Sequence, residues 1–466
     1  MVHDHTAVAA HFDSRTRGAR IESSPQNVRA TSHRSTSRAL LAAALSACLG
    51  APAPALANGR FPAAQHLVGG VGDAASRLAV RTTFGILTSA DDGRSWRYLC
   101  EDLLGLSNTS TWDAPIVIAP DGALFAGLPD GLARVTDGCA APRVSEVGGD
   151  FSADLTATRD GATVYWVGSS GPTRNRVLAS IDGGRTWEMR GAARDGVLLE
   201  TIEASDADPR RVYVSAVQLE PRAYLLLRSD DGARTFREIP IPRADLAGAY
   251  LAGLDGDRAD GVWLRCPLRA DGGPEGGTAL LHSDDGGARF TEVSRTRGPM
   301  MGFAIRDDGT VWYGGPDDGL WRRARGGTSE SIASIPLTCL RWHRDALYAC
   351  ANHARTGWAV ARSRDDGARF DPVLRFEDIL GPPVCARGTV GADVCSARWS
   401  ALRRTLQPDA GSAPDAGRTT PDATPPEATP SSGGCACATP FALRARGTAY
   451  LLALGALAFL RRRRRR

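Results

Sequence analysis

The segment SADDGRSW at residues 89–96 recurs four more times, with small changes, along this 466-residue chain. The other copies are SIDGGRTW at 180–187, SDDGARTF at 229–236, SDDGGARF at 283–290 and SRDDGARF at 363–370. Self-similar segments at regular spacing are typical of repeat proteins, in which neighbouring repeats bury a shared core. The five octapeptides therefore predict a repeat architecture.

Each octapeptide follows the pattern Ser-x-Asp-x-Gly-x-x-Trp/Phe, with Ala233 in place of glycine in the third copy. Ser and Asp side chains can hydrogen-bond the backbone of a tight turn, Gly permits a positive φ, and the aromatic residue can enter the core. We expect a structural role at these positions: Ser89, Asp91, Gly93, Trp96, Ser180, Asp182, Gly184, Trp187, Ser229, Asp231, Phe236, Ser283, Asp285, Gly287, Phe290, Ser363, Asp365, Gly367 and Phe370.

The octapeptide resembles the Asp box, or BNR repeat, of sialidases and related β-propellers. DGALFAGLPDGLARV at 121–135 and DGTVWYGGPDDGLWRR at 308–323 have the order of turn, strand, turn and strand expected of blades that have lost the box. The seven markers are spaced by roughly 45 residues, as expected for four-stranded blades. The predicted fold is all-β, a seven-bladed β-propeller. Six or eight blades stay open, because strands around 66–88 could close the last blade.

The N-terminal segment 1–57 is expected to be a disordered leader followed by a signal peptide. The arginines at 29, 34 and 38 precede the apolar run ALLAAALSACLG and then APAPALA, the order of an export signal. Cleavage after Ala57 is one interpretation, and lipoprotein processing at Cys48 within LSAC is the other. Both predict export of the domain predicted over 58–406.

The C-terminal segment has two parts. Residues 407–434 are rich in Pro, Ala, Thr and Ser, which predicts an extended stalk. Residues 435–466 contain Cys435 and Cys437, a short apolar run at 448–460 and six terminal arginines, and they resemble the MYXO-CTERM sorting signal of myxobacteria. The resemblance implies a sorting protease, contact with the membrane through this tail, and a place at the cell surface or outer envelope, with the protein anchored or released.

Composition excludes several classes of function. The chain has no lysine, which rules out Schiff-base chemistry and a phosphate-loop lysine. Six arginines and three acids lie in 1–57 and eight arginines in 444–466, so the net charge of +4 becomes −7 for the rest. An acidic exported domain is poorly suited to nucleic acid.

The cysteines fit an oxidising compartment. We expect one disulfide between Cys339 and Cys350, which flank a predicted hairpin, and one between Cys385 and Cys395, after the last blade. Cys100 and Cys139 would form a third across neighbouring blades, which leaves Cys266 unpaired. No pair of Cys or His residues has the spacing of zinc ligands, and DGDRADG at 255–261 is interpreted as a surface turn, so no metal and no cofactor are expected.

The only candidate catalytic residue is Arg60. Arg60-Phe61-Pro62 resembles the Arg-Ile-Pro motif of the first sialidase strand, although Phe61 departs from it. A sialidase needs three arginines for the sugar carboxylate, a Tyr nucleophile with its Glu, and an Asp acid/base. Tyrosines 213, 250 and 313 could form nucleophile pairs with glutamates 200, 203 and 275, but they are interpreted mainly as strand and loop residues. A sugar-binding face could use the tryptophans outside the octapeptides for stacking, although most are expected in the core between blades: Trp112, Trp263, Trp312, Trp321, Trp342 and Trp358.

These observations favour an exported, surface-tethered propeller that recognises a glycan or a surface protein. The alternative is a glycoside hydrolase of the sialidase type, which requires several arginines to meet in the central pocket. A structural envelope protein is the third hypothesis, and it predicts no such pocket.

Overall fold

The structure is a computed structural model that describes residues 61–406, apart from 107–111, 170–174, 194 and 271–275. The regular secondary structure of the described residues is mostly β-strand, and the strands are arranged in seven antiparallel sheets. The segments predicted to be the leader, the stalk and the tail, with Cys435 and Cys437, lie outside the described residues.

The sheets follow one another along the chain, and each is an up-and-down meander. Blade 1 contains β1 (Ala64–Gly69), β2 (Leu78–Thr82), β3 (Gly85–Ser89) and β4 (Arg97–Leu99), and blade 2 contains β5 (Ile116–Ile118), β6 (Leu124–Leu128) and β7 (Gly131–Val135). Blade 3 contains β8 (Phe151–Ala157), β9 (Val164–Ser169), β10 (Asn175–Ser180) and β11 (Glu188–Ala192), and blade 4 contains β12 (Val197–Ala204), β13 (Val212–Gln218), β14 (Ala223–Ser229) and β15 (Arg237–Ile241). Blade 5 contains β16 (Tyr250–Leu254), β17 (Val262–Pro267), β18 (Thr278–Ser283) and β19 (Thr291–Thr296). Blade 6 contains β20 (Gly302–Ile305), β21 (Val311–Gly315), β22 (Gly319–Arg323) and β23 (Ser329–Ala333), and blade 7 contains β24 (Leu337–His343), β25 (Ala346–Ala351), β26 (Val360–Ser363) and β27 (Asp371–Leu374).

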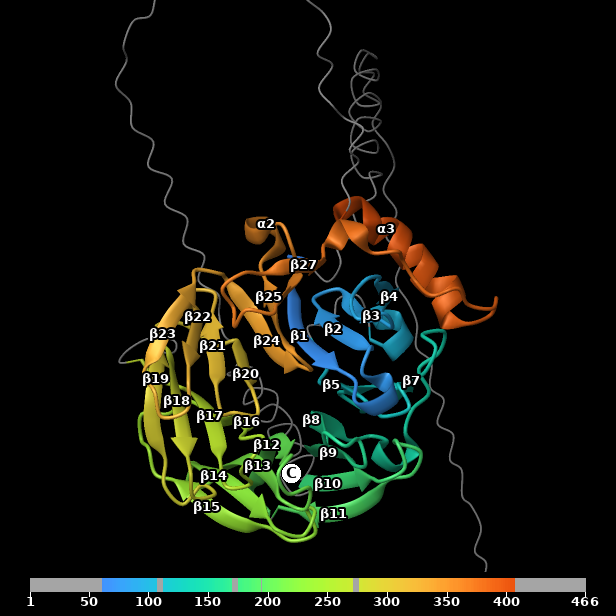
Figure 1. Ribbon diagram of the computed structural model, residues 1–466. Coiled ribbons are helices and arrows are strands. Elements are labelled where there is room, and N and C mark those ends of the chain that lie inside the picture. The colour runs from blue at the N-terminus through green and yellow to red at the C-terminus, as the bar shows by residue number, and fades with distance from the viewer. Residues whose placement is uncertain (1–60, 107–111, 170–174, 194, 271–275, 407–466) are drawn as a thin grey trace, which may run out of the picture. The chain divides into compact units, whose positions relative to one another are not determined.

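The first strands of the seven blades surround a central axis, as Figure 1 shows. Each contacts the first strand of the next blade, and β24 contacts β1 to complete the ring. The expectation of a seven-bladed propeller is confirmed. Because β1 to β4 pair within one sheet, none of the described N-terminal strands joins the last blade, and the alternatives of six or eight blades are wrong.

All five octapeptides form the same turn between the third and fourth strands of their blades. In each, the amide of the fifth residue donates to the Ser Oγ at 2.7–2.9 Å, and the amide of the seventh donates to the Asp Oδ1 at 2.9 Å. The turn also packs on the preceding blade: the Trp96 indole donates to the Val373 carbonyl of blade 7 at 2.8 Å. The motif thus orders both a hairpin and a blade interface.

Removal of the turn carboxylate should be measurable in stability. Asp182 accepts hydrogen bonds from the Thr186 amide and hydroxyl, which hold the pKa of Asp182 below its usual range. We expect Asp182→Ala to lower the free energy of unfolding by about 1–2 kcal/mol, because buried or constrained donors lose their acceptor. Urea denaturation checks this, with exposed Ile181→Ala in the same turn as a control that should stay within about 0.5 kcal/mol. Equal losses would contradict the structural role.

The two other repeat markers also lie in blades, but at a different hairpin. Residues 121–135 form a turn, β6, a turn and β7, and residues 308–323 form the matching elements around β21 and β22, so the marked turns join the second and third strands. In blade 2 a fourth strand is replaced by residues 142–144, where the Val144 amide donates to the Leu132 carbonyl at 2.8 Å.

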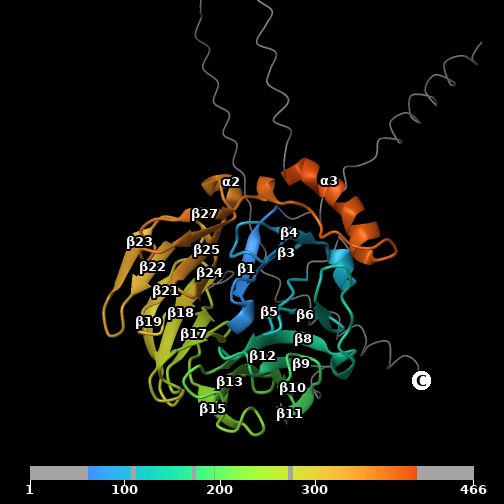
Figure 2. The ribbon, with the colours of Figure 1, turned by 45° about the vertical axis from the view of Figure 1, so that its right-hand side comes forward.

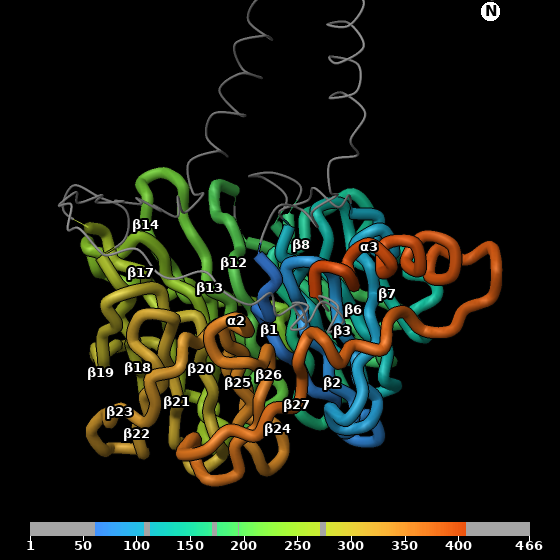
Figure 3. The backbone as a smooth tube through the Cα atoms, turned by 90° about the horizontal axis from the view of Figure 1, so that it is seen from above, coloured from blue at the N-terminus to red at the C-terminus, as the bar shows by residue number. Residues whose placement is uncertain are grey.

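Residues 375–406, here the C-terminal clasp, return from blade 7 across blades 1 and 2. The clasp contains short helical turns at Phe376–Asp378 (η4) and Gly391–Cys395 (η5), and helix α3 (Ser396–Leu406). Figure 2 and Figure 3 show α3 on the rim of the ring. The clasp also contacts β4, the outer strand of blade 1: the Tyr98 amide donates a hydrogen bond to the Gly381 carbonyl of the clasp at 2.9 Å. The remaining described helices are short: α2 (His353–Thr356), η1 (Gly72–Ala74), η2 (Glu101–Leu104) and η3 (Ser145–Val147).

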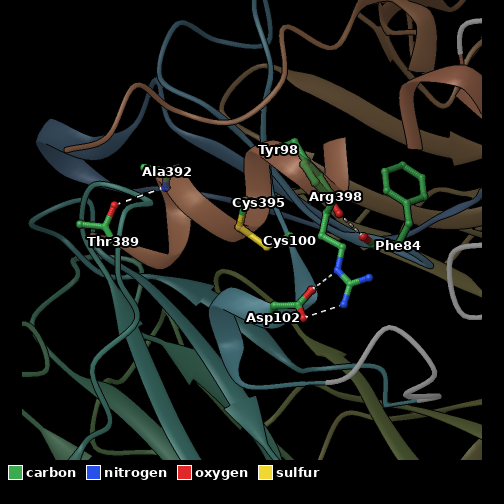
Figure 4. Close-up of a disulfide and its surroundings, with 8 residues drawn as sticks. All are labelled: Phe84, Tyr98, Cys100, Asp102, Thr389, Ala392, Cys395 and Arg398. Carbon is green, nitrogen blue, oxygen red and sulfur yellow. Dashed lines mark hydrogen bonds and ion pairs between the residues drawn. A yellow bond between two sulfur atoms is a disulfide. The ribbon is translucent and has the colours of Figure 1, made fainter. Parts of the chain in front are cut away.

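The clasp corrects two of the expected disulfides. Cys100 pairs with Cys395, and Cys139 pairs with Cys385, so the Cys385–Cys395 and Cys100–Cys139 pairings are wrong. The reason is that the clasp lies over the start of the ring, which brings each of its cysteines beside one from blade 1 or 2 (Figure 4).

The third disulfide joins Cys339 and Cys350 across β24 and β25, as expected, and Cys266 is a buried free thiol. Three disulfides indicate an oxidising, extracellular environment. Within the part of the chain that the structure describes, no helix has both the length and the apolar character needed to cross a membrane.

Candidate functional site: an axial pocket

A cavity of about 750 Å³ lies on the axis of the ring, and residues from the first strands of all seven blades line it. We call it the axial pocket. Its near end is the end at which these strands begin, and its far end is the end at which they finish. A volume of this size falls within the range of small-ligand sites.

Five arginines line the pocket. Arg159 and Arg344 lie at its far end, and the other three, here the pocket arginines, come from blades 1, 5 and 7. They are Arg81 on β2, Arg265 on β17 and Arg341 on β24. The Arg81 Nη1 donates to the Ala114 carbonyl at 3.1 Å, and burial lowers the pKa of Arg265. Between them they form a cationic wall of the pocket, in which Arg81 and Arg265 are half-buried and Arg341 is exposed.

The positive charge of this wall contributes to a lowered pKa of His66 on β1. Burial, with the nearby charges of Arg81 and Arg341, lowers the pKa of His66 to about 3. The imidazole is therefore neutral at physiological pH, and it offers one donor and one acceptor to a ligand.

Two carboxyl groups face the pocket arginines from neighbouring strands. Asp154 on β8 accepts a hydrogen bond from the Ile202 amide at 3.0 Å, and Glu203 on β12 accepts one from the Thr156 hydroxyl at 3.1 Å. Burial raises the pKa of Asp154 to about 6; burial and the charge of Asp154 raise the pKa of Glu203 to about 7. The pair therefore changes charge near neutral pH.

An ion-pair network crosses the far end. Arg159 follows β8 in blade 3, and its Nη2 lies 2.6 Å from Asp307, which follows β20 in blade 6. Its Nε lies 3.3 Å from Asp206, which follows β12 in blade 4. Asp307 reaches over the turn of blade 5, because a Cβ added to Gly256 would come within 2.9 Å of its carboxylate.

The octapeptide residues are absent from the lining of the pocket, which places these turns at the outer strands and away from the site. Arg60 lies outside the described residues. Among the tyrosines, Tyr213 donates its hydroxyl to the Ala259 carbonyl and Tyr313 to Ser294, so neither is presented to the pocket as a nucleophile.

Aromatic residues are mostly core, as the sequence suggested. Trp263, Trp312 and Trp358 are buried, and Trp342 is the tryptophan of that set that lines the pocket, stacked on Trp312 with centroids 5.2 Å apart. Phe303 lines it as well, which gives the pocket two apolar surfaces among its charged groups.

A second cluster lies in a cavity of about 420 Å³ between blades 5 and 6. Ligand atoms of Asp255, His282 and Asp284 lie within 4.8 Å of one another, a donor set that could suit a metal ion. The guanidinium of Arg258, however, contacts both carboxylates, so a cationic group already occupies the position between them. Asp255 is fully buried, which corrects the interpretation of 255–261 as a plain surface turn.

Comparisons with known proteins agree with the fold. No family model and no curated protein matches the sequence. An ancestral GH74 enzyme is 12% identical and has a TM-score of 0.51, over 67% of this chain and 46% of its own, so the chain spans less than half of that enzyme. A GH74 xyloglucanase from Xanthomonas campestris is 14% identical over 71% of this chain and 66% of its own (TM-score 0.31), and YCF48 bound to a D1 peptide is 16% identical over 48% and 66% (TM-score 0.34).

At these identities the likeness shows the fold alone. The fold and the site define a seven-bladed β-propeller with a charged pocket on its axis.

Proposed function

We propose that this propeller is an exported recognition module that binds an acidic glycan in its axial pocket. The observation that carries the proposal is the convergence of Arg81, Arg265 and Arg341 on the axial pocket. Guanidinium groups bind carboxylates through paired, charge-assisted hydrogen bonds. Opposing carboxyl groups with pKa values of about 6 and about 7 leave this space cationic at or below neutral pH.

A glycan fits this pocket better than a folded protein surface does. The site is a cavity on the axis and not a flat face, and it offers hydroxyl-binding acceptors and donors beside the half-buried Trp342 and Phe303. Polar groups that fix orientation beside apolar surfaces that exclude water are the usual make-up of a small-ligand site. Surface tethering through the C-terminal tail belongs to the same proposal, supported by the oxidising environment that the disulfides indicate.

Removal of one pocket arginine tests the proposal. We expect Arg341→Ala to raise the Kd for a uronic-acid oligosaccharide by about tenfold or more, since a charge-assisted hydrogen bond contributes about 1.5–3 kcal/mol. Calorimetry on the purified, oxidised protein gives the measurement. Arg387→Ala, which removes the same charge from the exposed surface of the clasp, should leave the Kd unchanged. Equal effects of the two changes would place binding outside the pocket.

Hydrolysis is the second candidate, and the Asp154–Glu203 pair is the observation that favours it. One carboxyl group that holds a proton near pH 7 beside another that is ionised resembles the acid and base of glycoside hydrolysis. The binding proposal predicts no saturable turnover of a fluorogenic glycoside panel. Turnover that Glu203→Gln abolishes, with binding retained, would replace recognition by catalysis.

A further inference from the structure

The ion-pair network at the far end joins blades that are not neighbours. Blade 5 lies between blades 4 and 6 in the ring, yet the Arg159 guanidinium of blade 3 reaches Asp307 of blade 6 at 2.6 Å. Blades 4 and 5 both lie between blades 3 and 6, which therefore stand on nearly opposite sides of the ring of seven. An ion pair between them spans the ring close to its axis. Asp206 of blade 4 holds the same guanidinium from its other side at 3.3 Å.

The Arg159 guanidinium is held by two carboxylates, Asp307 and Asp206. Arg159 makes a hydrogen bond to Asp307 that raises the pKa of Arg159, and the side chain of Asp206 on its other side is 30% exposed. A guanidinium shared by two carboxylates loses less conformational freedom per bond than an isolated surface pair does. The arrangement forms a bar across the far end of the axial pocket.

The near end has no matching bar among the described residues. The contacts observed there join neighbouring blades only: Gln65 of blade 1 donates to Asp113 of blade 2 at 3.4 Å, and Arg265 of blade 5 donates to the Met300 carbonyl of blade 6 at 3.5 Å. Met301, which lines this end, is 41% exposed. The two ends of the pocket therefore differ in the residues that the structure describes.

We infer that the axial pocket is closed at its far end by Arg159, Asp206 and Asp307, and that it therefore accepts the end of an acidic glycan chain and not an internal stretch. The inference rests on the proposed function for its ligand. A pocket that is closed at one end admits a terminal residue, whereas an open channel or a surface groove lets a polymer run through. Arg159 is a specificity-determining residue in this arrangement, and it acts by excluding chain and not by binding it.

Chain length is the variable that separates the two modes of binding. We would titrate the full-length, oxidised protein with oligogalacturonides of three, six and twelve residues by calorimetry. Binding of chain ends predicts one protein per chain at every length and a Kd, expressed per mole of chain, that changes by less than about threefold. Several proteins per twelve-residue chain, or a Kd that falls steadily with length, would overturn the inference.

The bar itself predicts the behaviour of a variant. Arg159→Ala should open the far end, so that the twelve-residue chain binds at least about tenfold more tightly relative to the three-residue chain than it does in the unchanged protein. Arg325→Ala is the matched control: it removes an ion pair with Asp257 between neighbouring blades 5 and 6, outside the pocket. The control should keep the length dependence of the unchanged protein. No effect of Arg159→Ala, or an equal effect of both changes, would contradict closure by the bar.

Closure can be measured without any glycan. Ala157, the last residue of β8, lines the pocket next to the bar. A cysteine placed there, in a Cys266→Ser background, should react at least about tenfold faster with a charged methanethiosulfonate once Arg159→Ala is added, and not with Arg325→Ala. Faster labelling with no oligogalacturonide binding at any length would refute the proposed ligand while leaving closure in place. Unchanged labelling would refute closure.

Discussion

Replacement of Cys100 and Cys395 by serine should lower the free energy of unfolding by about 4 kcal/mol, and replacement of all four clasp cysteines should cost roughly twice as much. In the part of the chain that the structure describes, no strand is shared between the first and last blades, so the clasp supplies the covalent closure of the ring. The two clasp bonds span 295 and 246 residues. While one bond remains, the other closes a loop of only about 50 residues, and loss of both releases the long loop to the unfolded chain.

The bond between Cys339 and Cys350 is the control for this prediction. It spans 11 residues within one hairpin of blade 7, so its removal should cost about 3 kcal/mol and leave the ring closed. Urea denaturation gives the free energies, and hydrogen exchange of β1 and β24 shows where the structure opens. Exchange that rises at β1 and β24 only in the clasp variants is the expected pattern. Loss of stability in equal measure from the hairpin bond and from all four clasp cysteines would mean that the clasp does not close the ring.

Local signals explain why the fold could be predicted from the sequence. Each octapeptide forms its turn through bonds between residues at most four apart, as Ser180 with Gly184 and Asp182 with Thr186 show. Such a motif has the same conformation wherever it occurs, and its spacing counts the blades. The sequence contains no local signal for the clasp disulfides. Cys385 and Cys395 are close in sequence, but the path of the clasp over blades 1 and 2 brings each of them to a different, distant partner.

The pocket could be predicted only in part. Arg81 in LAVRT and Arg265 in VWLRCP are charged residues inside otherwise apolar strands, and that break in the pattern was a usable signal. With 56 arginines in a chain that has no lysine, the residue type alone selected nothing. Only closure of the ring brings strands from blades 1, 5 and 7 around one space, and no spacing in the sequence encodes that meeting.

The affinity for an acidic oligosaccharide should rise by about tenfold or more as the pH falls from 8 to 5.5. Above pH 7, ionised Glu203 and Asp154 attract the pocket arginines and repel an anionic ligand. Because burial holds their pKa values at about 7 and about 6, both lose most of their charge by pH 5.5. A uronic carboxylate, with an ordinary carboxyl pKa near 4, stays largely ionised there. A gain of about tenfold corresponds to about 1.4 kcal/mol, a modest share of the charge interactions in such a site.

The control for this pH dependence is a variant of Glu203, whose carboxyl group is surrounded by other charged groups. Asp154 on β8, Arg341 on β24 and Asp206 at the far end are the charged groups that act on its carboxyl, and Thr156 donates a hydrogen bond to it. Glu203→Gln keeps the shape and removes one of the two titrations, so its affinity at pH 8 should lie between the values that the unchanged protein shows at pH 8 and at pH 5.5. The folded state holds the proton on Glu203 more tightly than the unfolded chain does, so stability should fall as the pH rises from about 4 to about 7, and this fall should shrink in Glu203→Gln. An affinity that is flat with pH in the unchanged protein, or equally steep in the variant, would remove these carboxyl groups from the binding site.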